Sequence, residues 1–421
     1  MDVRQYSVFM PKQTGYADLP LHTGTVPKWL ADRMMSLGTL IVESLIYNFG
    51  KKEVLSRLSD PLWFQSFGAV LGMDWHSSGI TTSVMYALKR GLNPKAHELG
   101  ICICGGRGKY SRRTPEELLY ISSAAGLNGD ALVHASKLCA KVDNTAVQDG
   151  FQLYQHNFIV TDQGDWAVIQ QGMNPETRTA RRYHWCSSNL RSFVETPHTA
   201  VVGQNVGAIL NLTDTAARAA RDTILELSRE NPDRTVSEYR HIACPDITGG
   251  GLLFPGAQEA RNCIMPAHHE VQAADVNLKR LGAVLATAYE SQPADFESLL
   301  LTDGLGPRTL QSLALISEVV YGTPDRFTDP ARFSFAHGGK DGHPFPVPCR
   351  IYDESIRILH ESIELSKLNY RDKSECFNRL HKTVLAVERN CVPEADFDQT
   401  VKLELAHSRE WGGRTCYSGL I

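Results

Sequence analysis

The sequence has no hydrophobic run long enough to cross a membrane. Its apolar run at residues 39–49 is interrupted by Glu43, and residues 1–8 lack the apolar core of a secretory signal. We therefore expect a soluble protein with a cytoplasmic location.

Paired cysteines are also missing. The chain has ten cysteines but no CxxC pair, and the only close couple is Cys102 and Cys104, spaced to face the same side of a strand. This pattern excludes a zinc ribbon and a disulfide framework, and it is typical of a reduced intracellular protein.

A net positive charge is the third absence. The formal net charge is −4, which excludes a protein that binds nucleic acid through an overall basic field. Any contact with DNA must come from local basic patches. With 42% hydrophobic and 21% charged residues, and no internal repeat, the 421-residue chain is globular and long enough for two or three domains.

The pattern of apolar residues predicts a mixed α+β fold. Apolar residues recur at helical spacing over residues 26–91, whereas two alternating segments flank Asp162-Gln-Gly164 as in a β-hairpin. The predicted regions are a helical N-terminal region at 1–95, an α/β region with a basic loop and the β-hairpin at 96–205, a helical region at 206–330 that ends in a helix-hairpin-helix at 295–322, and a polar loop with C-terminal helices at 331–421.

The most informative segment is residues 295–310, which resembles the helix-hairpin-helix that binds the DNA backbone in many repair glycosylases, nucleases and polymerases. Gly304 and Gly306 allow a tight turn against a phosphate, and Pro307 suits the first position of a helix. Free amides at the helix start, with Arg308 and Thr309, are then predicted to hold phosphates without reading a base. The alternative is an ordinary helical hairpin whose glycines only turn the chain.

A second basic segment follows the short apolar strand at 99–104. It fits neither nucleotide-binding glycine motif, which excludes ATP binding, and it precedes a helix for which Thr114 is the predicted N-cap and Glu117 the capping-box glutamate. Its cations suit a phosphodiester backbone, although a solvated loop is the alternative. They are Arg107, Lys109, Arg112 and Arg113.

Three polar segments contain candidate catalytic residues. Asp74 and His76 lie in a loop with four hydroxyl side chains, and Asp149 and His156 flank the start of the β-hairpin. Each pair is predicted to bind a divalent metal, Mg²⁺ or Mn²⁺, or to act as a base. The alternatives are a capping network and a buried, hydrogen-bonded histidine.

The third segment is the Gly-, Pro- and His-rich loop at 337–346. Glycines around Lys340 and Asp341 would let the backbone come close to a ligand, and Lys340 could meet a phosphate or a reactive sugar carbon. Both residues are therefore further catalytic candidates, with a tightly turned structural loop as the alternative.

Four strings resemble a family of bacterial and archaeal proteins, the DUF763 domain of unknown function. They are Thr-Gly-Tyr-Ala-Asp-Leu-Pro-Leu-His at 14–22, Leu-Ser-Asp-Pro-Leu-Trp-Phe-Gln at 58–65, Asp-Trp-His-Ser-Ser-Gly at 74–79, and His-Gly-Gly-Lys-Asp-Gly-His-Pro-Phe-Pro at 337–346. The similarity covers nearly the whole chain and implies no particular activity.

Together these features predict a DNA-processing protein, with a metal-dependent nuclease as the leading hypothesis. One alternative is a helix-hairpin-helix glycosylase that uses Asp329, which lies shortly after the second helix of the hairpin. The other is a DNA-binding protein without catalysis. Single-stranded, branched or damaged DNA is the expected partner, and a homodimer is plausible because one hairpin usually needs a second contact.

Overall fold

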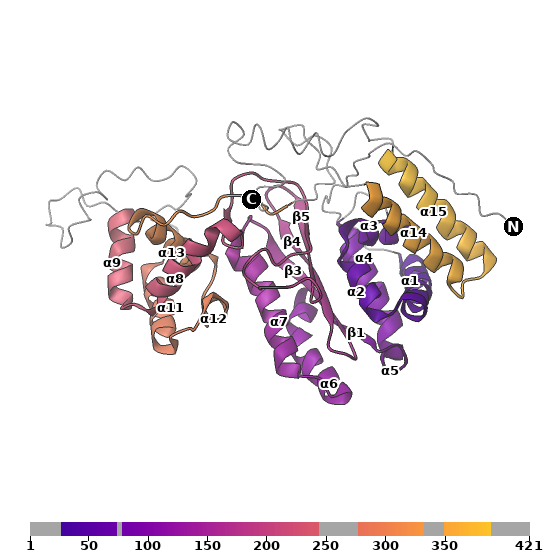
Figure 1. Cartoon of the computed structure of the whole chain (residues 1–421), viewed down its shortest axis with the longest axis horizontal. Helices are drawn as coiled ribbons and strands as arrows, with labels where there is room; N and C mark the ends of the chain where they lie inside the picture. Colours follow the sequence, from indigo (N-terminus) through magenta and orange to yellow (C-terminus); the bar gives the residue numbers. More distant parts are fainter. Residues whose placement is uncertain (1–26, 74–77, 244–276, 332–348, 389–421) are drawn as a thin grey trace.

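The computed structural model describes residues 27–73, 78–243, 277–331 and 349–388, and it confirms the mixed α+β fold. A five-stranded antiparallel sheet stands between two groups of helices (Figure 1). The strand order is β1 (Ile101–Arg107), β3 (Gln152–Thr161), β4 (Trp166–Asn174), β5 (Thr179–Cys186) and β6 (Ala200–Val202). None of the described helices is both long and apolar enough to span a membrane.

The predicted β-hairpin is confirmed by strands β3 and β4. Gly164 takes a left-handed φ of 83° in the connecting turn, where the Thr161 amide donates to Asp165 O over 2.9 Å. Successive residues of β3 alternate between the two faces, yet both Ile159 and Val160 are buried because helices cover the sheet on both sides.

The N-terminal helices cover one face of the sheet. Ile103, Ile159 and Ile169 pack there against α2–α4. Helix α3 starts at Pro61, because the Asp60 carboxylate accepts from the Trp63 amide over 2.7 Å and proline suits the first helical position. The helices of this group are α1 (Lys28–Phe49), α2 (Lys51–Ser59), α3 (Pro61–Val70), α4 (Gly79–Leu92) and α5 (Ala96–Leu99).

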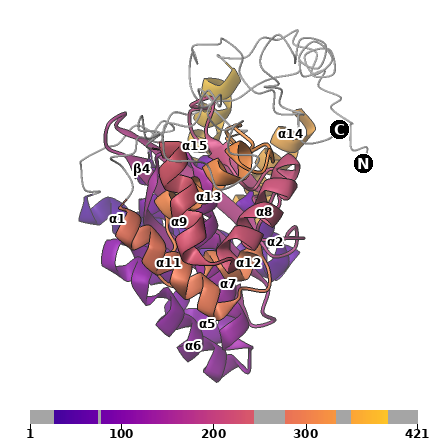
Figure 2. The same cartoon turned by 90° about the vertical axis from the view of Figure 1, so that its left-hand side faces the viewer.

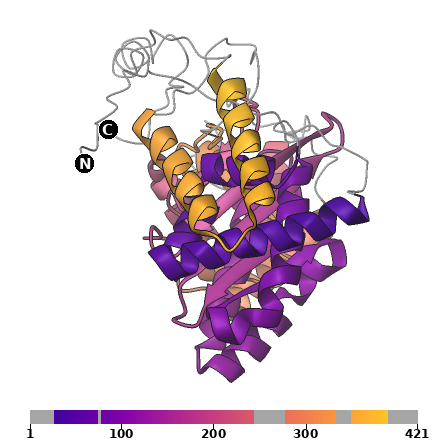
Figure 3. The ribbon, with the colours of Figure 1, turned by 90° about the vertical axis from the view of Figure 1, so that its right-hand side faces the viewer.

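Two later helices join the same core. Helices α14 (Cys349–Leu365) and α15 (Tyr370–Glu388) form an antiparallel pair that lies across α1 and α3 (Figure 3). Their residues Ile358 and Leu359 share a hydrophobic core with Met34, and Arg33 forms an ion pair with Asp372 at 3.3 Å. Residues more than 300 positions apart therefore build one unit.

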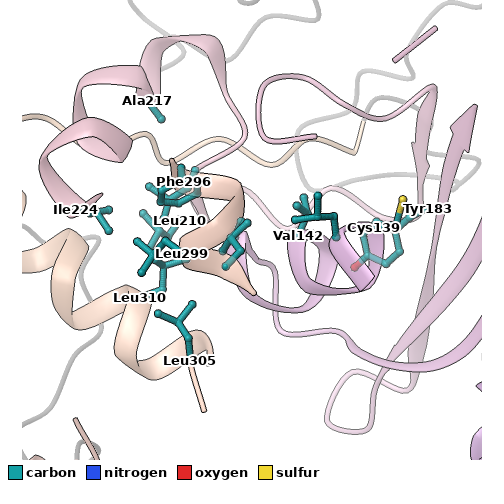
Figure 4. Packing of buried hydrophobic residues seen from close by; sticks show 14 of the residues in the cluster. Cys139, Val142, Tyr183, Leu210, Ala217, Ile224, Phe296, Leu299, Leu305 and Leu310 are labelled. Carbon is teal, nitrogen blue, oxygen red and sulfur yellow. The ribbon is translucent and has the colours of Figure 1, made fainter. Parts of the chain in front are cut away.

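The other face of the sheet carries α6 (Thr114–Ala125) and α7 (Gly129–Lys141), followed by the π-helical turn η3 (Val142–Ala146). Beyond α7 stands a helical unit whose members are α8 (Arg218–Arg229), α9 (Pro232–Ala243), α11 (Leu278–Ser291), α12 (Phe296–Leu300) and α13 (Pro307–Val319) (Figure 2). Its apolar side chains are continuous with the core of the sheet, and Figure 4 shows Leu299 and Leu310 beside Phe296 and Leu210.

Short strands fasten this helical unit to the sheet. Strands β2 (Val147–Gln148) and β7 (Leu210–Asn211) pair with each other, and Leu210 also bridges to Phe327. The chain thus returns from α13 to the sheet along residues 326–329.

Candidate nucleic-acid interface

Helices α12 and α13 are joined by a tight turn at residues 301–306. The Asp295 carboxylate caps α12 by accepting from the Ser298 amide over 2.7 Å. Gly304 has φ 79°, so its left-handed backbone explains that glycine. Between the glycines, Leu305 is only 2% exposed and fixes the turn to the core.

Gly306 differs from Gly304 because no contact with the described residues requires a glycine there. Its φ of −140° and ψ of 179° are extended values that any residue adopts. A Cβ at this position would meet no described atom closer than Gly304 O, at 4.0 Å. Gly306 is also the N-cap of α13, a 13-residue helix, and no side chain of the described residues caps the first amides of that helix.

Two side chains hold the turn in place from the neighbouring elements. Lys141, at the end of α7, donates to Leu305 O over 2.7 Å, and Gln148 donates to Pro307 O over 2.9 Å. Burial lowers the pKa of Lys141, and the nearby Asp303 acts in the opposite direction. Two hydrogen bonds therefore fix the turn, and the donor of one of them is the Lys141 side chain.

The two predicted side-chain donors of this turn differ in exposure. Arg308 is exposed, and its guanidinium donates to Gln311 over 3.2 Å on the same helix. Thr309 is only 7% exposed, so its side chain faces the core. Of these two side chains, only that of Arg308 is thus presented to solvent, and the acidic Asp303 of the same turn is exposed as well.

The basic segment forms the short 3-10 helix η2 (Gly108–Arg113) directly after β1. The Glu117 carboxylate accepts from the Gly105 amide and from Lys89, each over 2.7 Å, and Lys89 also donates to Gly105 O over 2.7 Å. Thr114 does not cap α6 as predicted: it is the first helical residue, and its hydroxyl donates back to Ser111 O over 2.7 Å. The expected capping residues instead anchor the basic segment.

The cations of this segment are exposed and mostly lack acid partners in the described part of the chain. Arg107 lies 5.8 Å from the ring centre of Tyr154, and Lys109 lies 5.6 Å from that of Tyr110. The only ion pair that these four cations form with a described residue joins Arg113 to Glu116 at 4.0 Å. The segment thus keeps its positive charge.

The hairpin turn and the basic segment both connect to the end of the sheet where β1 finishes and β3 begins. Arg107 ends β1 opposite Gln155, near the start of β3, and Gln148 binds the hairpin turn four residues before that strand begins. In Figure 1, α12 and α13 stand to the left of the sheet, and β1 is its edge strand. A ligand that touched both would pass over the strand ends.

Asp149 is not an open ligand site. Its carboxylate accepts from Arg181 at 2.8 Å, from the Tyr183 hydroxyl at 2.6 Å and from the Phe151 amide at 3.0 Å. Arg181 also binds Asp329, at 2.7 Å, and all three ionic side chains are at most 1% exposed. Burial raises the pKa of Asp149, while the Arg181 charge opposes this shift.

The glycosylase alternative depends on Asp329. Like Asp149, this residue has a buried side chain with a structural role. Besides Arg181, its carboxylate accepts from the amides of Val206, at 2.7 Å, and Ala331, at 2.8 Å. These bonds fasten the returning chain to β5 and leave the carboxylate inaccessible to a substrate.

His156 belongs to a different buried network on the α7 side of the sheet. Its Nδ1 faces Gln170 Oε1 at 2.7 Å, so Nδ1 carries the proton, and Nε2 accepts from the Ser136 hydroxyl at 2.9 Å. Gln170 in turn donates to Asp143, which also binds Trp185 and His198. Burial lowers the pKa of His156. Both ring nitrogens are therefore occupied within the core.

Asp149 and His156, the two predicted metal ligands that lie in the described residues, do not form a site for a divalent ion. Asp149 is beside a guanidinium, His156 has no free nitrogen, and the two residues lie in separate networks. No group of three His, Cys, Asp or Glu side chains in the described ranges could hold a metal. Asp74, His76, Lys340 and Asp341 lie outside the described residues, and their roles stay predictions.

Arg181 and Arg182 are consecutive residues of β5, and both are fully buried. Arg182 points to the N-terminal helices, where it donates to His184 over 2.8 Å and to Gln65 over 2.9 Å. It has no acid partner in the described part of the chain, and burial lowers its pKa to about 9. Alternation along β5 predicts that the two arginines point to opposite faces of the sheet. Nothing in the local sequence indicates that helices cover both of these faces.

The fold and these surfaces define an α+β protein with two exposed, rigid features that suit phosphate groups. The chain belongs to the family described as Protein of unknown function (DUF763), whose model matches residues 15–347. No curated protein and no solved structure matches the chain.

Proposed function

We propose that this protein binds DNA through the sugar-phosphate backbone, at the turn between α12 and α13. The observation that carries the proposal is Gly306, a glycine that no contact with the described residues requires. A phosphate oxygen seated on the amides of the first turn of α13 would occupy the space of the missing Cβ. The positive end of the helix dipole and the exposed Arg308 favour the same anion.

The binding mode follows from what the turn offers. Backbone amides and one guanidinium recognise phosphate, whereas base edges are read by side chains that enter a groove. We therefore expect little preference between sequences. The net charge of −4 also means that binding depends on these local groups and weakens steeply with salt.

Replacing Gly306 with alanine should weaken DNA binding roughly tenfold or more, because losing one charge-assisted hydrogen bond costs about 1.5–3 kcal/mol. The added methyl group has no internal clash, so thermal stability should be unchanged. Fluorescence anisotropy with a labelled duplex measures the affinity, and a thermal melt checks the fold.

The matched control is Gly282→Ala on α11, in the same helical unit. An added Cβ there would meet only Val236, at an ordinary contact distance of 3.7 Å. Its affinity should equal that of the wild type. Equal affinity of Gly306→Ala and wild-type protein would remove the hairpin turn as the binding site.

Phosphodiester hydrolysis is a separate proposal that rests on the sequence. Its candidates Asp74, His76, Lys340 and Asp341 lie outside the described residues, and no contact among the described residues favours it over binding alone. A denaturing gel of the same duplexes with Mg²⁺ or Mn²⁺, beside an EDTA lane, distinguishes the two. Cut strands only in the metal lanes would add a nuclease activity to the binding function.

A cytoplasmic location is part of the proposal. Five of the cysteines in the described ranges, Cys102, Cys104, Cys139, Cys186 and Cys376, are free and buried. Free thiols of this kind are typical of a reducing compartment, where bacterial and archaeal DNA is also found.

A further inference from the structure

We infer that the basic segment between β1 and α6 is a binding site for single-stranded DNA, with Tyr110 as the platform on which a base stacks. This inference rests on the proposed DNA binding and extends it, because it assigns the single strand to a place other than the hairpin turn. Its components are the cations Arg107, Lys109, Arg112 and Arg113, and the tyrosine among them.

The segment is held rigidly before any ligand arrives. Gly105 is fixed by both Lys89 and Glu117, and the Ser111 hydroxyl closes the 3-10 turn by donating to Gly108 O over 2.7 Å. Close packing leaves no room for a Cβ at Gly105, where it would lie 2.3 Å from His156 O. A preorganised surface loses little entropy on binding, so its charges contribute more fully to affinity.

The charges of the segment are available to phosphates. Lys109 and Arg107 lie over aromatic rings rather than beside carboxylates, and Arg112 has no ion pair among the described residues. An exposed cation that a protein does not neutralise itself suits an anionic partner. Three such cations, Arg107, Lys109 and Arg112, together with Arg113, fall within seven residues and match the repeated charge of a nucleic-acid backbone.

Tyr110 distinguishes a single strand from a duplex. Its side chain is 49% exposed in the middle of the cations, and Lys109 leans against its ring. An exposed ring can stack on a base only where that base has left its own stack, as in a single strand. Duplex DNA offers the segment phosphates but no free base face.

The position of the segment fits a branched or partly unpaired substrate. β1 is the edge strand of the sheet and the basic segment follows its end, whereas the hairpin turn is held by Lys141 and Gln148, shortly before β3 begins. A duplex at the hairpin turn and a single strand at the basic segment would therefore occupy two separate places near one end of the sheet.

The test measures two affinities for each variant by fluorescence anisotropy, one with an oligo-deoxythymidine of about 16 nucleotides and one with a hairpin-closed duplex. Tyr110→Ala should weaken binding of the single strand about tenfold and leave duplex binding within about twofold. Tyr110→Phe, which keeps the ring, should bind both like the wild type. The double variant Arg112→Ala/Arg113→Ala should also lower the salt slope for the single strand by roughly 1.4.

Tyr370→Ala/Arg371→Ala on α15 is the matched control, because Tyr370 is 89% exposed, Arg371 is exposed, and their helix packs on α3 and α14. It should bind both DNAs like the wild type. Unchanged single-strand affinity in Tyr110→Ala would overturn the inference, while weakened duplex binding in Gly306→Ala would still support the proposed function. Binding of anionic phospholipid vesicles that Arg112→Ala/Arg113→Ala abolishes, with DNA binding intact, would reassign the segment to a membrane surface.

Discussion

Replacing Arg181 with methionine should destabilise the protein by about 3–5 kcal/mol, the usual effect of removing one partner from a buried ion pair. The guanidinium is fully buried and neutralises two carboxylates, Asp149 and Asp329. Without it, both carboxylates would be buried with no cationic partner. Urea denaturation at pH 7 measures the loss of unfolding free energy.

The stability of the same variant should depend on pH in an expected direction. Burial raises the pKa of Asp149 above its ordinary value in the folded protein, and removal of the Arg181 charge raises it further. A group with a raised folded pKa stabilises the fold below its unfolded pKa, and this contribution is lost as the pH rises through the folded pKa. The free energy of unfolding of Arg181→Met should therefore come closer to that of the wild type when the pH falls from 7 to about 5.

Arg182→Met is the control for this experiment. Arg182 is the next residue and equally buried, but it has no acid partner in the described ranges, so its removal leaves no carboxylate uncompensated. Because burial and the Arg182 charge both lower the pKa of His184, only the recovery of Arg181→Met beyond that of Arg182→Met is assigned to Asp149. A deficit in Arg181→Met that stays constant between pH 7 and 5 would contradict the role given to the Asp149–Arg181–Asp329 cluster.

Replacing Gly105 with alanine should destabilise the protein by about 2–5 kcal/mol and displace the basic segment. Gly105 has φ 83°, which disfavours any residue with a Cβ by about 1–2 kcal/mol. The new Cβ would also lie 2.3 Å from His156 O and 2.4 Å from the Thr114 hydroxyl, an overpacking that costs about 1–3 kcal/mol. Urea denaturation measures the first effect, and weaker binding of the single strand reports the second.

Gly108→Ala is the control for Gly105→Ala, because it places a Cβ on a left-handed backbone without a steric clash. Gly108 has φ 60°, yet an added Cβ would meet nothing within 4 Å. Its stability should fall by only about 1–2 kcal/mol. Equal losses in the two variants would show that the close packing of Gly105 against β3 contributes nothing.

Local sequence patterns were enough to predict several elements. The Asp162-Gln-Gly164 turn between alternating segments predicted β3 and β4, and the glycine, proline and apolar pattern at 295–322 predicted the helices on either side of a tight turn. In each case the information lies within a few residues of the element it specifies, as turn chemistry and helix periodicity require.

The tertiary partners could not be predicted in the same way. Asp149, Arg181 and Asp329 are far apart in the sequence, and nothing local marks them as one cluster. Polar strand residues such as His156 resembled ligands because alternation normally places them in solvent, whereas here both faces of the sheet are covered. The packing of α14 and α15 on α1 likewise depends on long-range contacts that a single sequence does not encode.

The most direct test of the central claim is the salt dependence of DNA binding by the wild-type protein. Fluorescence anisotropy with two duplexes of unrelated sequence, at several salt concentrations, gives the slope of log affinity against log salt. Backbone binding predicts equal affinities and a slope of roughly −0.9 for each phosphate contacted. No binding at low salt, or a strong preference for one sequence with a flat salt dependence, would contradict the account.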